Sequence, residues 1–566
     1  MPVHRGITSE VYGGGSELRI QKEIILGIGG RKLLKALNIE PGVCHINEGH
    51  AAFLVLERAA NFMKATGTSF EEALATTRAG NIFTTHTAVG AGFDHFDPSL
   101  MWRFFGAYAK NDLGIDFNDF LAMGRQDSGN VSENFNMAFS ALRGSGAVNG
   151  VSRLHGEVSR RLFQNMFPRW PKDEVPVGSV TNGVHMPSWD SESADKIWTD
   201  ACGKDRWRGD LETLKFDISG VSDTELWQLR QTSRAKLVDY VRQRFAKHLR
   251  DTAEPNEVAD IASNIFDPNT LTLGFAWHFV PYKRPNSLLC DTERFIRLLT
   301  DPDPPVQLVI AGKSPPFDES GKALIRQWVQ FIQQHILYHH AVFFSDYDML
   351  LKEPLVQGAD VWVNTPRRPR EAYGTSGMKV LVNGSINLSQ LDGCWAEAYN
   401  PEVGWALGDT YEYDTGTNWD AMEADALYRI LEQEIVPKFY NRNQDGIPEE
   451  WIAKMRNSMA TLTPMFSAKR AVREYTEKHY LPAAVNYLKR ASKNGNIGKG
   501  IVSFRHDLRN KWKGIHFGEI SIDCVEGGFQ YNISESPNGI NPHTILVQLF
   551  ANGQNGERES TKRAHL

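Results

Sequence analysis

The fold class of this chain is decided by a stretch that reads LTLGFAWHF at 271–279, ERFIRLL at 293–299, VQLVIAGK at 306–313, ALIRQWVQFIQQHI at 323–336 and AVFFSDYD at 341–348. Short runs rich in β-branched and aromatic residues predict strands, whereas longer runs with apolar residues every three or four positions predict helices. Strand and helix alternate throughout the stretch. This order is typical of a parallel sheet covered by helices.

The same alternation continues after residue 348. It predicts a helix over 348–359, a strand over 359–365, a glycine-rich turn into a helix over 376–384, and a further apolar run over 386–393. At least five strand-to-helix steps follow one another, so we predict one doubly wound α/β domain in this part of the chain.

Three short apolar runs before residue 190 end in polar turns and predict a second α/β layer. They are GVCHINEG (42–49), NIFTTHT (81–87) and VPVGSVTNG (175–183), and helical patterns separate them. A long charged amphipathic helix over 222–250 then leads into the later domain.

Helical periodicity is predicted to stop near Lys493, where β-like runs begin to alternate with polar turns. We therefore predict three parts. Residues 1–190 form a first α/β domain, residues 191–492 form a second, doubly wound α/β domain, and residues 493–566 form a small β-rich extension.

The composition narrows the class of protein. A chain of 566 residues with 41% hydrophobic content can bury sizeable cores, and its net charge of -6 comes without the long single-sign runs of nucleic-acid-binding arms. Its five cysteines are scattered and form no CxxC pair, which indicates a reducing compartment and no zinc site. No signal-like or membrane-spanning apolar segment is present, so we expect a soluble, cytoplasmic protein that binds neither nucleic acid nor membrane.

The segment DVWVNTPRRPREAYGTSGMKVLVNGSINLSQLDG (360–393) carries the strongest chemical signal. Gly374, Thr375, Ser376 and Gly377 lie between a predicted strand and a helix, where free backbone N–H groups can hold a phosphate. Lys379 follows in the predicted first turn of the helix. A lysine beside an anion site in apolar surroundings can act as a nucleophile toward an aldehyde cofactor, although composition alone favours a solvated helix lysine.

Other motifs are weaker or absent. The GxGG at 27–30 follows SELRIQKEIIL, which has helical periodicity, so we interpret it as a helix-to-helix turn and not as a dinucleotide loop. The sequence contains no GxxxxGK[ST], HExxH or GxSxG string. It therefore lacks the motifs that would indicate a P-loop protein, a zincin or an α/β-hydrolase.

The 360–393 segment resembles the pyridoxal-phosphate box of α-glucan phosphorylases, above all the TPRRPxEASGTSGMK pattern of their shorter bacterial and archaeal branch. The resemblance continues in order over most of residues 6–490. It includes YGGGSELRIQKEIILGIGG (12–30), HINEGHAAF (45–53), TTHT (84–87), FNMAFSALR (135–143), VNGVSRLHGEVSR (148–160) and SVTNGVH (179–185).

This resemblance implies a pair of Rossmann-like domains in the GT-B arrangement of glycosyltransferases and a set of site residues. Lys379 would carry the Schiff base of pyridoxal 5'-phosphate, Gly374 and Thr375 would contact the cofactor phosphate, and Glu371 would bind a glucose hydroxyl. His86 and Asn182 would contact the bound sugar. Without the resemblance, a lone His or Asn in a turn is more often a structural group.

The segment GFAWHFVPYKRP (274–285) resembles the family stretch GFARRFATYKRA, which supplies positive charge to phosphate groups. Lys283 matches its lysine, Arg284 adds a candidate substrate cation, and Tyr282 is a candidate cofactor contact. The catalytic candidates are thus Lys283, His278 and Glu371, and no metal is expected.

Several positions depart from the family pattern. Trp277 and His278 stand where the family has two arginines, which reduces a cation to a titratable imidazole. Tyr373 stands where the family has serine. The THTAVGAGFDHF stretch (85–96) differs from THTPVPAGHDRF at Ala88, Gly90, Phe93 and His95.

The resemblance also implies that the family's sequence extends upstream of this chain and includes a glycine-rich loop not found here. By this resemblance residues 1–190 would be an incomplete sugar-binding domain with exposed apolar edges, and residues 191–492 would be the catalytic domain that binds the cofactor. Either a separate chain completes the first domain, as a partner or within a homo-oligomer, or the chain is a truncated gene product.

The activity implied by the resemblance is phosphorolysis of an α-glucan such as glycogen or maltodextrin. Inorganic phosphate would release α-D-glucose 1-phosphate with retention, and pyridoxal phosphate would act through its phosphate group. Two alternatives remain open at this point. One is a catalytically impaired or inactive glucan-binding homologue, and the other is a glucan synthase that uses a sugar nucleotide.

Overall fold

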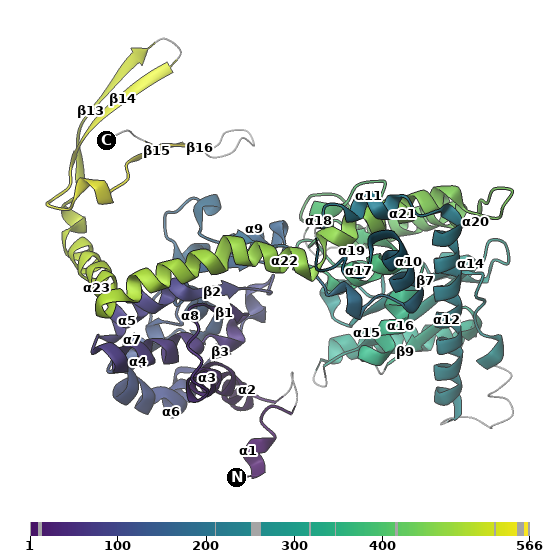
Figure 1. Cartoon of the computed structure of the whole chain (residues 1–566), viewed down its shortest axis with the longest axis horizontal. Coiled ribbons are helices and arrows are strands. Elements are labelled where there is room, and N and C mark those ends of the chain that lie inside the picture. The colour runs from purple at the N-terminus through teal and green to yellow at the C-terminus, as the bar shows by residue number, and fades with distance from the viewer. Residues whose placement is uncertain are drawn as a thin grey trace.

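The computed structural model describes residues 2–9, 14–209, 211–250, 262–315, 318–345, 347–413, 417–525, 528–551 and 560–563. These residues form two α/β lobes side by side and a β-hairpin that projects from the end of the first lobe (Figure 1). Each lobe has its own hydrophobic core. The predicted α/β class and the C-terminal β-structure are confirmed.

The first lobe is built on a four-stranded parallel sheet in the order β1-β2-β5-β6. Its strands are β1 (Cys44–Asn47), β2 (Asn81–Thr84), β5 (Ala147–Gly150) and β6 (Gly178–Ser179). Its main helices are α2 (Ser16–Ile24), α3 (Gly30–Ala36), α4 (Leu54–Thr66), α5 (Phe70–Thr77), α6 (Pro98–Tyr108), α7 (Phe117–Ala122), α8 (Met137–Arg143) and α9 (Arg153–Phe163). A short antiparallel pair, β3 (His95–Phe96) with β4 (Phe135–Asn136), lies outside this sheet.

The second lobe contains a six-stranded parallel sheet in the order β12-β11-β10-β7-β8-β9. Its strands are β7 (Leu271–His278), β8 (Val306–Lys313), β9 (Ala341–Phe344), β10 (Val361–Asn364), β11 (Ile386–Gln390) and β12 (Gly404–Leu407). Its helices are α10 (Glu192–Cys202), α11 (Leu214–Ser219), α12 (Asp223–Arg250), α14 (Thr292–Thr300), α15 (Glu319–Gln334), α16 (Met349–Gly358), α17 (Thr375–Val380), α18 (Trp395–Ala398), α19 (Thr417–Ile430), α20 (Val436–Tyr440) and α21 (Glu449–Met465). The strands and helices predicted between 271 and 393 are all present.

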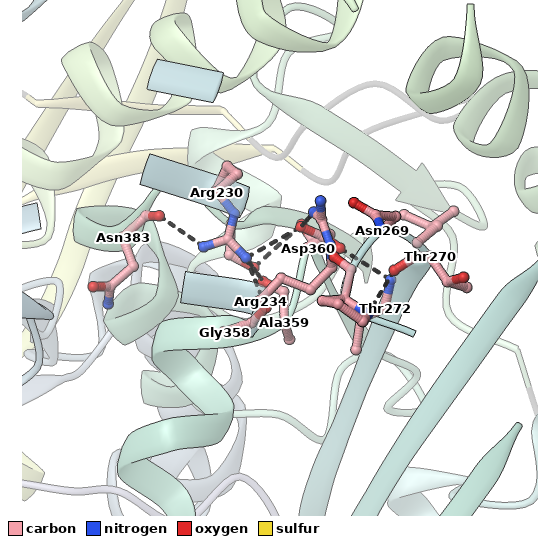
Figure 2. A network of polar contacts seen from close by, with 12 residues as sticks. Arg230, Arg234, Asn269, Thr270, Thr272, Gly358, Ala359, Asp360 and Asn383 are labelled. Atoms are coloured by element: carbon pink, nitrogen blue, oxygen red, sulfur yellow. Dashed lines mark hydrogen bonds and ion pairs between the residues drawn. The ribbon is translucent and has the colours of Figure 1, made fainter. Parts of the chain in front are cut away.

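A buried charge network joins α12 to the start of the central strand β10 (Figure 2). Asp360 accepts hydrogen bonds from Arg230 at 3.2 Å, from Arg234 at 2.8 Å and from the Thr272 amide at 3.0 Å. The Arg230 guanidinium also donates to four backbone carbonyls. Three lie at the end of α16, and the fourth, that of Asn383, lies in the turn that follows α17. These contacts fix the long helix against the sheet, because buried charges are stable only when they are paired and hydrogen-bonded.

After α21 the chain returns to the first lobe. Helices α22 (Ala468–Tyr475) and α23 (Leu481–Lys511) lie along it (Figure 1). The Tyr475 hydroxyl accepts from Asn149 at 2.9 Å, and Tyr480 bonds His45 at 2.8 Å. The prediction that helical structure stops near Lys493 is wrong: the backbone breaks at 492–495, where Gly495 takes a positive φ, and the helix then resumes. The proposed division at 190 and 492 stays a prediction.

The chain therefore passes between the lobes twice, and the two passages touch. The Val184 amide donates to the Phe466 carbonyl at 2.9 Å, and the Ala468 amide donates to the Val184 carbonyl at 2.8 Å. A Cβ atom on Gly183 would lie 2.4 Å from the Ser467 carbonyl oxygen, so only glycine allows this approach.

Three smaller features complete the fold. The predicted helix-to-helix turn at the GxGG segment is wrong: the chain stays helical from α2 through the π-helical segment Ile25–Gly29 into α3, and Gly29 and Gly30 both have right-handed helical backbone angles. Strands β13 (His516–Val525) and β14 (Gly528–Ser536) form the projecting hairpin, and β15 (Gln548–Ala551) pairs with β16 (Ser560–Arg563). All five cysteines are free thiols, and no described helix is both long and apolar enough to cross a membrane.

Candidate functional site

The candidate site lies at the carboxyl ends of β7 and β10, where the turn before α17 meets the first lobe. Ser152 at the start of α9 donates to the Ala372 carbonyl at 2.8 Å across this junction. Gly374 is the N-cap of α17 and has a φ of 77°, a conformation that favours glycine. A Cβ placed there would meet nothing closer than 3.8 Å, so the turn leaves room beside the first N–H groups of the helix.

Lys379 is the fifth residue of the six-residue helix α17, and not part of its first turn as the sequence predicted. Its Nζ lies 3.9 Å from the centroid of the Trp189 ring. Burial, and after it the neighbouring Lys352, lower the pKa of Lys379 to about 7. A substantial fraction of this amine is therefore uncharged and nucleophilic at neutral pH.

Lys283 forms an ion pair with Glu371, with 2.9 Å between Nζ and Oε2. Both side chains are largely buried, so the pair is a fixed part of the site. The Glu371 amide in turn donates to Asp392 at 2.8 Å, and burial raises the pKa of Asp392 to about 7. The loop that carries Glu371 is thereby held to the end of β11.

His278 ends β7, and its backbone pairs with Lys313 of β8. Partial burial, followed by the positive charges of Lys283, Lys313 and Lys352, lowers the pKa of His278. The imidazole is thus a poor substitute for a permanent cation. The neighbouring Tyr282 has a raised pKa, chiefly through burial, while the side chain of Trp277 lies outside the described part of the chain.

His86 lies on the first-lobe side of the junction, just after β2. Its Nε2 is 2.6 Å from Asn47 Oδ1, its ring is 5.4 Å from the Tyr373 ring in an edge-on contact, and burial lowers its pKa to about 4. The buried Glu48 carboxylate accepts from the His86 amide at 2.6 Å and from Thr87 Oγ1 at 3.0 Å. Glu48 itself has a φ of 63°, which is a strained conformation for a glutamate and is common at functional sites.

Two predicted residues take other surroundings. The Asn182 amide donates to Val151 at 2.9 Å and its carbonyl accepts from Arg470 at 3.0 Å, so its backbone ties the loop after β6 to the end of β5 and to α22. The Arg284 guanidinium is committed to Glu423, to Gln390 at 3.2 Å and to the Thr365 carbonyl at 3.0 Å. This commitment disfavours its predicted role as a substrate ligand.

The structure thus brings together Lys379, Lys283, Glu371, His278 and Tyr282 from the second lobe, and it places His86 against Tyr373 across the junction. Sequence reasoning missed the three groups Trp189, Lys352 and Asp392. Trp189 follows the TNGVH motif by four residues, which was its one available signal. Lys352 lies in a helix and Asp392 lies just after a strand. The residues around them form no pattern that predicts a functional role.

A second polar cluster lies in the first lobe, where Glu23, His50 and Asp94 offer ligand atoms within 4.8 Å of one another. Arg19 already occupies it, with its guanidinium 2.8 Å from Asp94 and 3.1 Å from Glu23. Burial raises the pKa of Glu23 to about 10. An arginine inside the cluster and a protonated glutamate are unfavourable for a metal ion.

Comparison with known proteins gives one consistent result. The profile described as carbohydrate phosphorylase matches residues 31–406. Glycogen phosphorylase of Mycobacterium tuberculosis (strain CDC 1551 / Oshkosh) is 36% identical over 560 residues, which cover 96% of this chain and 64% of that protein. Maltodextrin phosphorylase of Thermococcus litoralis is 34% identical over 97% of this chain and 64% of its own length.

Glycogen phosphorylase of Aquifex aeolicus is 34% identical over 85% of this chain and 68% of that protein. The chain therefore spans about two thirds of the length of the relatives it matches.

Proposed function

The chain belongs to the carbohydrate phosphorylase family, and from this premise we propose that it is an α-glucan phosphorylase whose catalytic centre is the junction around Lys379. Its substrates would be inorganic phosphate and a glycogen- or maltodextrin-type glucan with terminal α-1,4-linked glucose. Its product would be α-D-glucose 1-phosphate, formed with retention. The two lobes would correspond to a GT-B pair, and the protein would act in the cytoplasm.

Pyridoxal 5'-phosphate is the cofactor that the family implies, and the residues at the junction fit it. An aldehyde reacts with an uncharged lysine amine, and burial gives Lys379 a substantial fraction of this form at neutral pH, with the face of Trp189 beside it. The open turn at Gly374 and Thr375 leaves N–H groups available for a phosphate. When bound, the cofactor supplies a phosphate group that can exchange a proton with the substrate phosphate.

The chain's own residues would do the remaining work. Lys283 brings positive charge toward an incoming phosphate, and its ion pair with Glu371 fixes the orientation of both side chains. His86, held by Glu48 and Asn47, presents a neutral imidazole that can hydrogen-bond a sugar hydroxyl without adding charge. The observation that carries the proposal is the place of Lys379: its amine lies 3.9 Å from the centroid of the Trp189 ring, on the helix that begins at the open Gly374 turn.

The first test is borohydride reduction of the purified protein, followed by peptide mass spectrometry of the segment around Lys379. We expect a reduced pyridoxyl-phosphate group on Lys379 and on no other lysine. A Lys379→Arg variant serves as the control and should carry none. If Lys379 stays unmodified after incubation with pyridoxal phosphate, the proposal fails for this chain.

A second candidate, an impaired or inactive glucan-binding homologue, is favoured by two observations. Tyr373 fills space between the lobes with its ring against His86, and Arg284 has no role left at the substrate side because acids and carbonyls hold it. The two candidates separate in a pair of assays. Release of glucose 1-phosphate from maltodextrin supports the enzyme, whereas maltodextrin binding without release supports the homologue.

A sugar-nucleotide-dependent synthase is the remaining alternative, and transfer of glucose from a nucleotide sugar to maltodextrin would identify it. Partners remain proposals as well. The apolar side chains of Leu26, Leu33 and Leu37 on the first lobe are 55–60% exposed. A second copy or a partner chain that covers them would shift the mass of the protein in light scattering.

A further inference from the structure

The hairpin of β13 and β14 projects away from both lobes, and one of its two faces is apolar (Figure 1). Directly opposed residues of an antiparallel pair lie on the same face, and so do residues two apart along one strand. The register of this ladder therefore places seven apolar side chains together. This surface, called the hairpin face below, consists of Phe517, Ile520, Ile522, Cys524, Phe529, Tyr531 and Ile533.

The hairpin face is open to solvent. Ile520, Ile522 and Phe529 are 58%, 56% and 65% exposed. The opposite face is polar apart from Val525 at its tip, and on it Asn532 donates to Asp523 at 2.8 Å. Its polar residues are Glu519, Ser521, Asp523, Gln530, Asn532 and Ser534. The hairpin is thus amphipathic, with its apolar side turned to water.

Such a surface is unfavourable for a hairpin on its own. Strands β13 and β14 contain ten and nine residues and pair only with each other in their sheet. A two-stranded hairpin is at best marginally stable in water, and it becomes stable when its apolar face packs against another layer. A contiguous exposed apolar surface of this kind indicates an interaction site.

The charges of the hairpin indicate which partner fits. Residues 516–536 contain no lysine or arginine, so the hairpin does not attract nucleic acid or an anionic membrane. Glu519 and Asp523 lie on the polar face, and Glu535 lies opposite Phe517 at the root of the hairpin. Two hairpins can therefore pack apolar face against apolar face while the acids of their polar faces stay on the outside.

The size of the hairpin face also suits a second copy. Ten-residue strands give it a length of about 33 Å, and two stacked sheets lie about 10 Å apart. Two such faces would bury on the order of 1,000 Å² in total, which is at the lower end for a specific interface. Because the hairpin extends away from the lobes, two copies can meet through it alone (Figure 1).

We propose that the hairpin face is a homodimer interface, in which the hairpins of two copies pack face to face as a small β-sandwich. Ile520, Ile522 and Tyr531 would form the middle of its core. Both copies contribute the same residues around a two-fold axis, so the contact closes on itself and gives a dimer. This inference does not depend on the proposed function.

The first test is sedimentation velocity of the full chain over a wide range of concentration. The mass should rise from 63.7 kDa toward twice that value as the concentration increases. Ile520→Thr combined with Ile522→Thr keeps the β-branched shape but removes apolar surface, so the dissociation constant should rise at least about ten-fold. The matched control, Ser521→Thr combined with Asn532→Thr, changes the polar face of the same hairpin and should leave the constant unaltered.

A thiol on the hairpin face shows whether the contact is in the right place. Cys524 is exposed, as is Cys290 of the second lobe. Alkylation of Cys524 should slow as the chain is concentrated, whereas alkylation of Cys290 should not, and the Ile520→Thr, Ile522→Thr variant should lose the protection. A chain that stays monomeric at every concentration would overturn the inference. So would a dimer in which Cys524 reacts as fast as in the monomer, because its interface would then be another surface.

Discussion

Two groups of charged side chains lie near the opposite ends of strand β10 in the second lobe, and they differ in how their charges are balanced. At the start of the strand, Asp360 accepts from two arginines and an amide, and all three charged side chains are at most 1% exposed. Beyond the end of the same strand, Lys352 and Lys379 lie 5.8 Å and 3.9 Å from the centroid of the Trp189 ring, and no carboxylate among the described residues forms an ion pair with either of them. In the first group each buried charge has a partner of opposite charge, whereas in the second group the lysines have none among the described residues.

The difference separates structural charge from charge kept for chemistry. A balanced buried network holds elements in place, whereas an unbalanced one costs folding free energy and retains reactivity. Single substitutions in the two groups should therefore change the free energy of unfolding in opposite directions.

Removing the acid from the balanced group should have the largest effect. We expect Asp360→Ala to lower the free energy of unfolding by about 3–5 kcal/mol, because it leaves two buried guanidinium groups without their carboxylate. Urea denaturation followed by tryptophan fluorescence measures the change. The matched control is Asp425→Ala, which also loses two arginine contacts but is 52% exposed, and it should cost far less because solvent screens exposed ion pairs. Equal losses in both variants would remove the distinction.

Removing the lysine of the unbalanced group should act in the opposite direction. We expect Lys379→Met to raise the free energy of unfolding by about 1–2 kcal/mol at pH 7 without cofactor, since a half-buried amine loses its desolvation cost. The same urea experiment measures it, with the exposed Lys313→Met as the control that should not change. A destabilised Lys379→Met would show that this lysine is structural.

The stability gained in Lys379→Met should also depend on pH. Burial lowers the pKa of Lys379 to about 7 in the folded state, from the 10.5 that is usual for lysine, so between these values the unfolded chain binds one more proton than the folded chain. Raising the pH therefore favours the folded unaltered protein, and its deficit relative to Lys379→Met should shrink by about 1 kcal/mol between pH 7 and pH 9. Urea midpoints at these two pH values check the sign, and a deficit that grows would contradict it.

The smallest effect is expected at the junction itself. Tyr373→Ser should lower the free energy of unfolding by about 0.5–1 kcal/mol through loss of the ring contact with His86. It should also tighten maltodextrin binding several-fold in calorimetry, because the ring no longer occupies the space beside His86. Tyr411→Ser is a control, since Tyr411 is 70% exposed and lies elsewhere. Weaker binding in Tyr373→Ser would indicate that the ring stacks on the sugar.

Much of the fold was predictable because the second lobe alternates apolar strands and amphipathic helices without interruption. Strand β8 occupies the same residues as its sequence run, 306–313. Strand β5 was missed, since AVNG offers only four small or polar residues and its strand character comes from its neighbours in the sheet. The length of α23 was misjudged because the SKNG break at 492–495 has the composition of a helix end, and packing against α5 restores the helix after it.

The site was predictable where a motif orders several residues along the chain, as around Lys379. It was less so where distant segments meet. Nothing in the sequence around Lys352 reveals that α16 brings it to Lys379, and the acids that hold Arg284 lie about 140 residues further along the chain. Such contacts depend on how the elements pack, which local patterns do not encode.

The two passages of the chain between the lobes, which touch at Gly183 and Ser467, have a mechanical consequence. Because both connections cross between the lobes side by side and are hydrogen-bonded to each other, neither can shift without the other. A bulkier residue at Gly183 would force the two connections apart, and the change would reach both lobes at once.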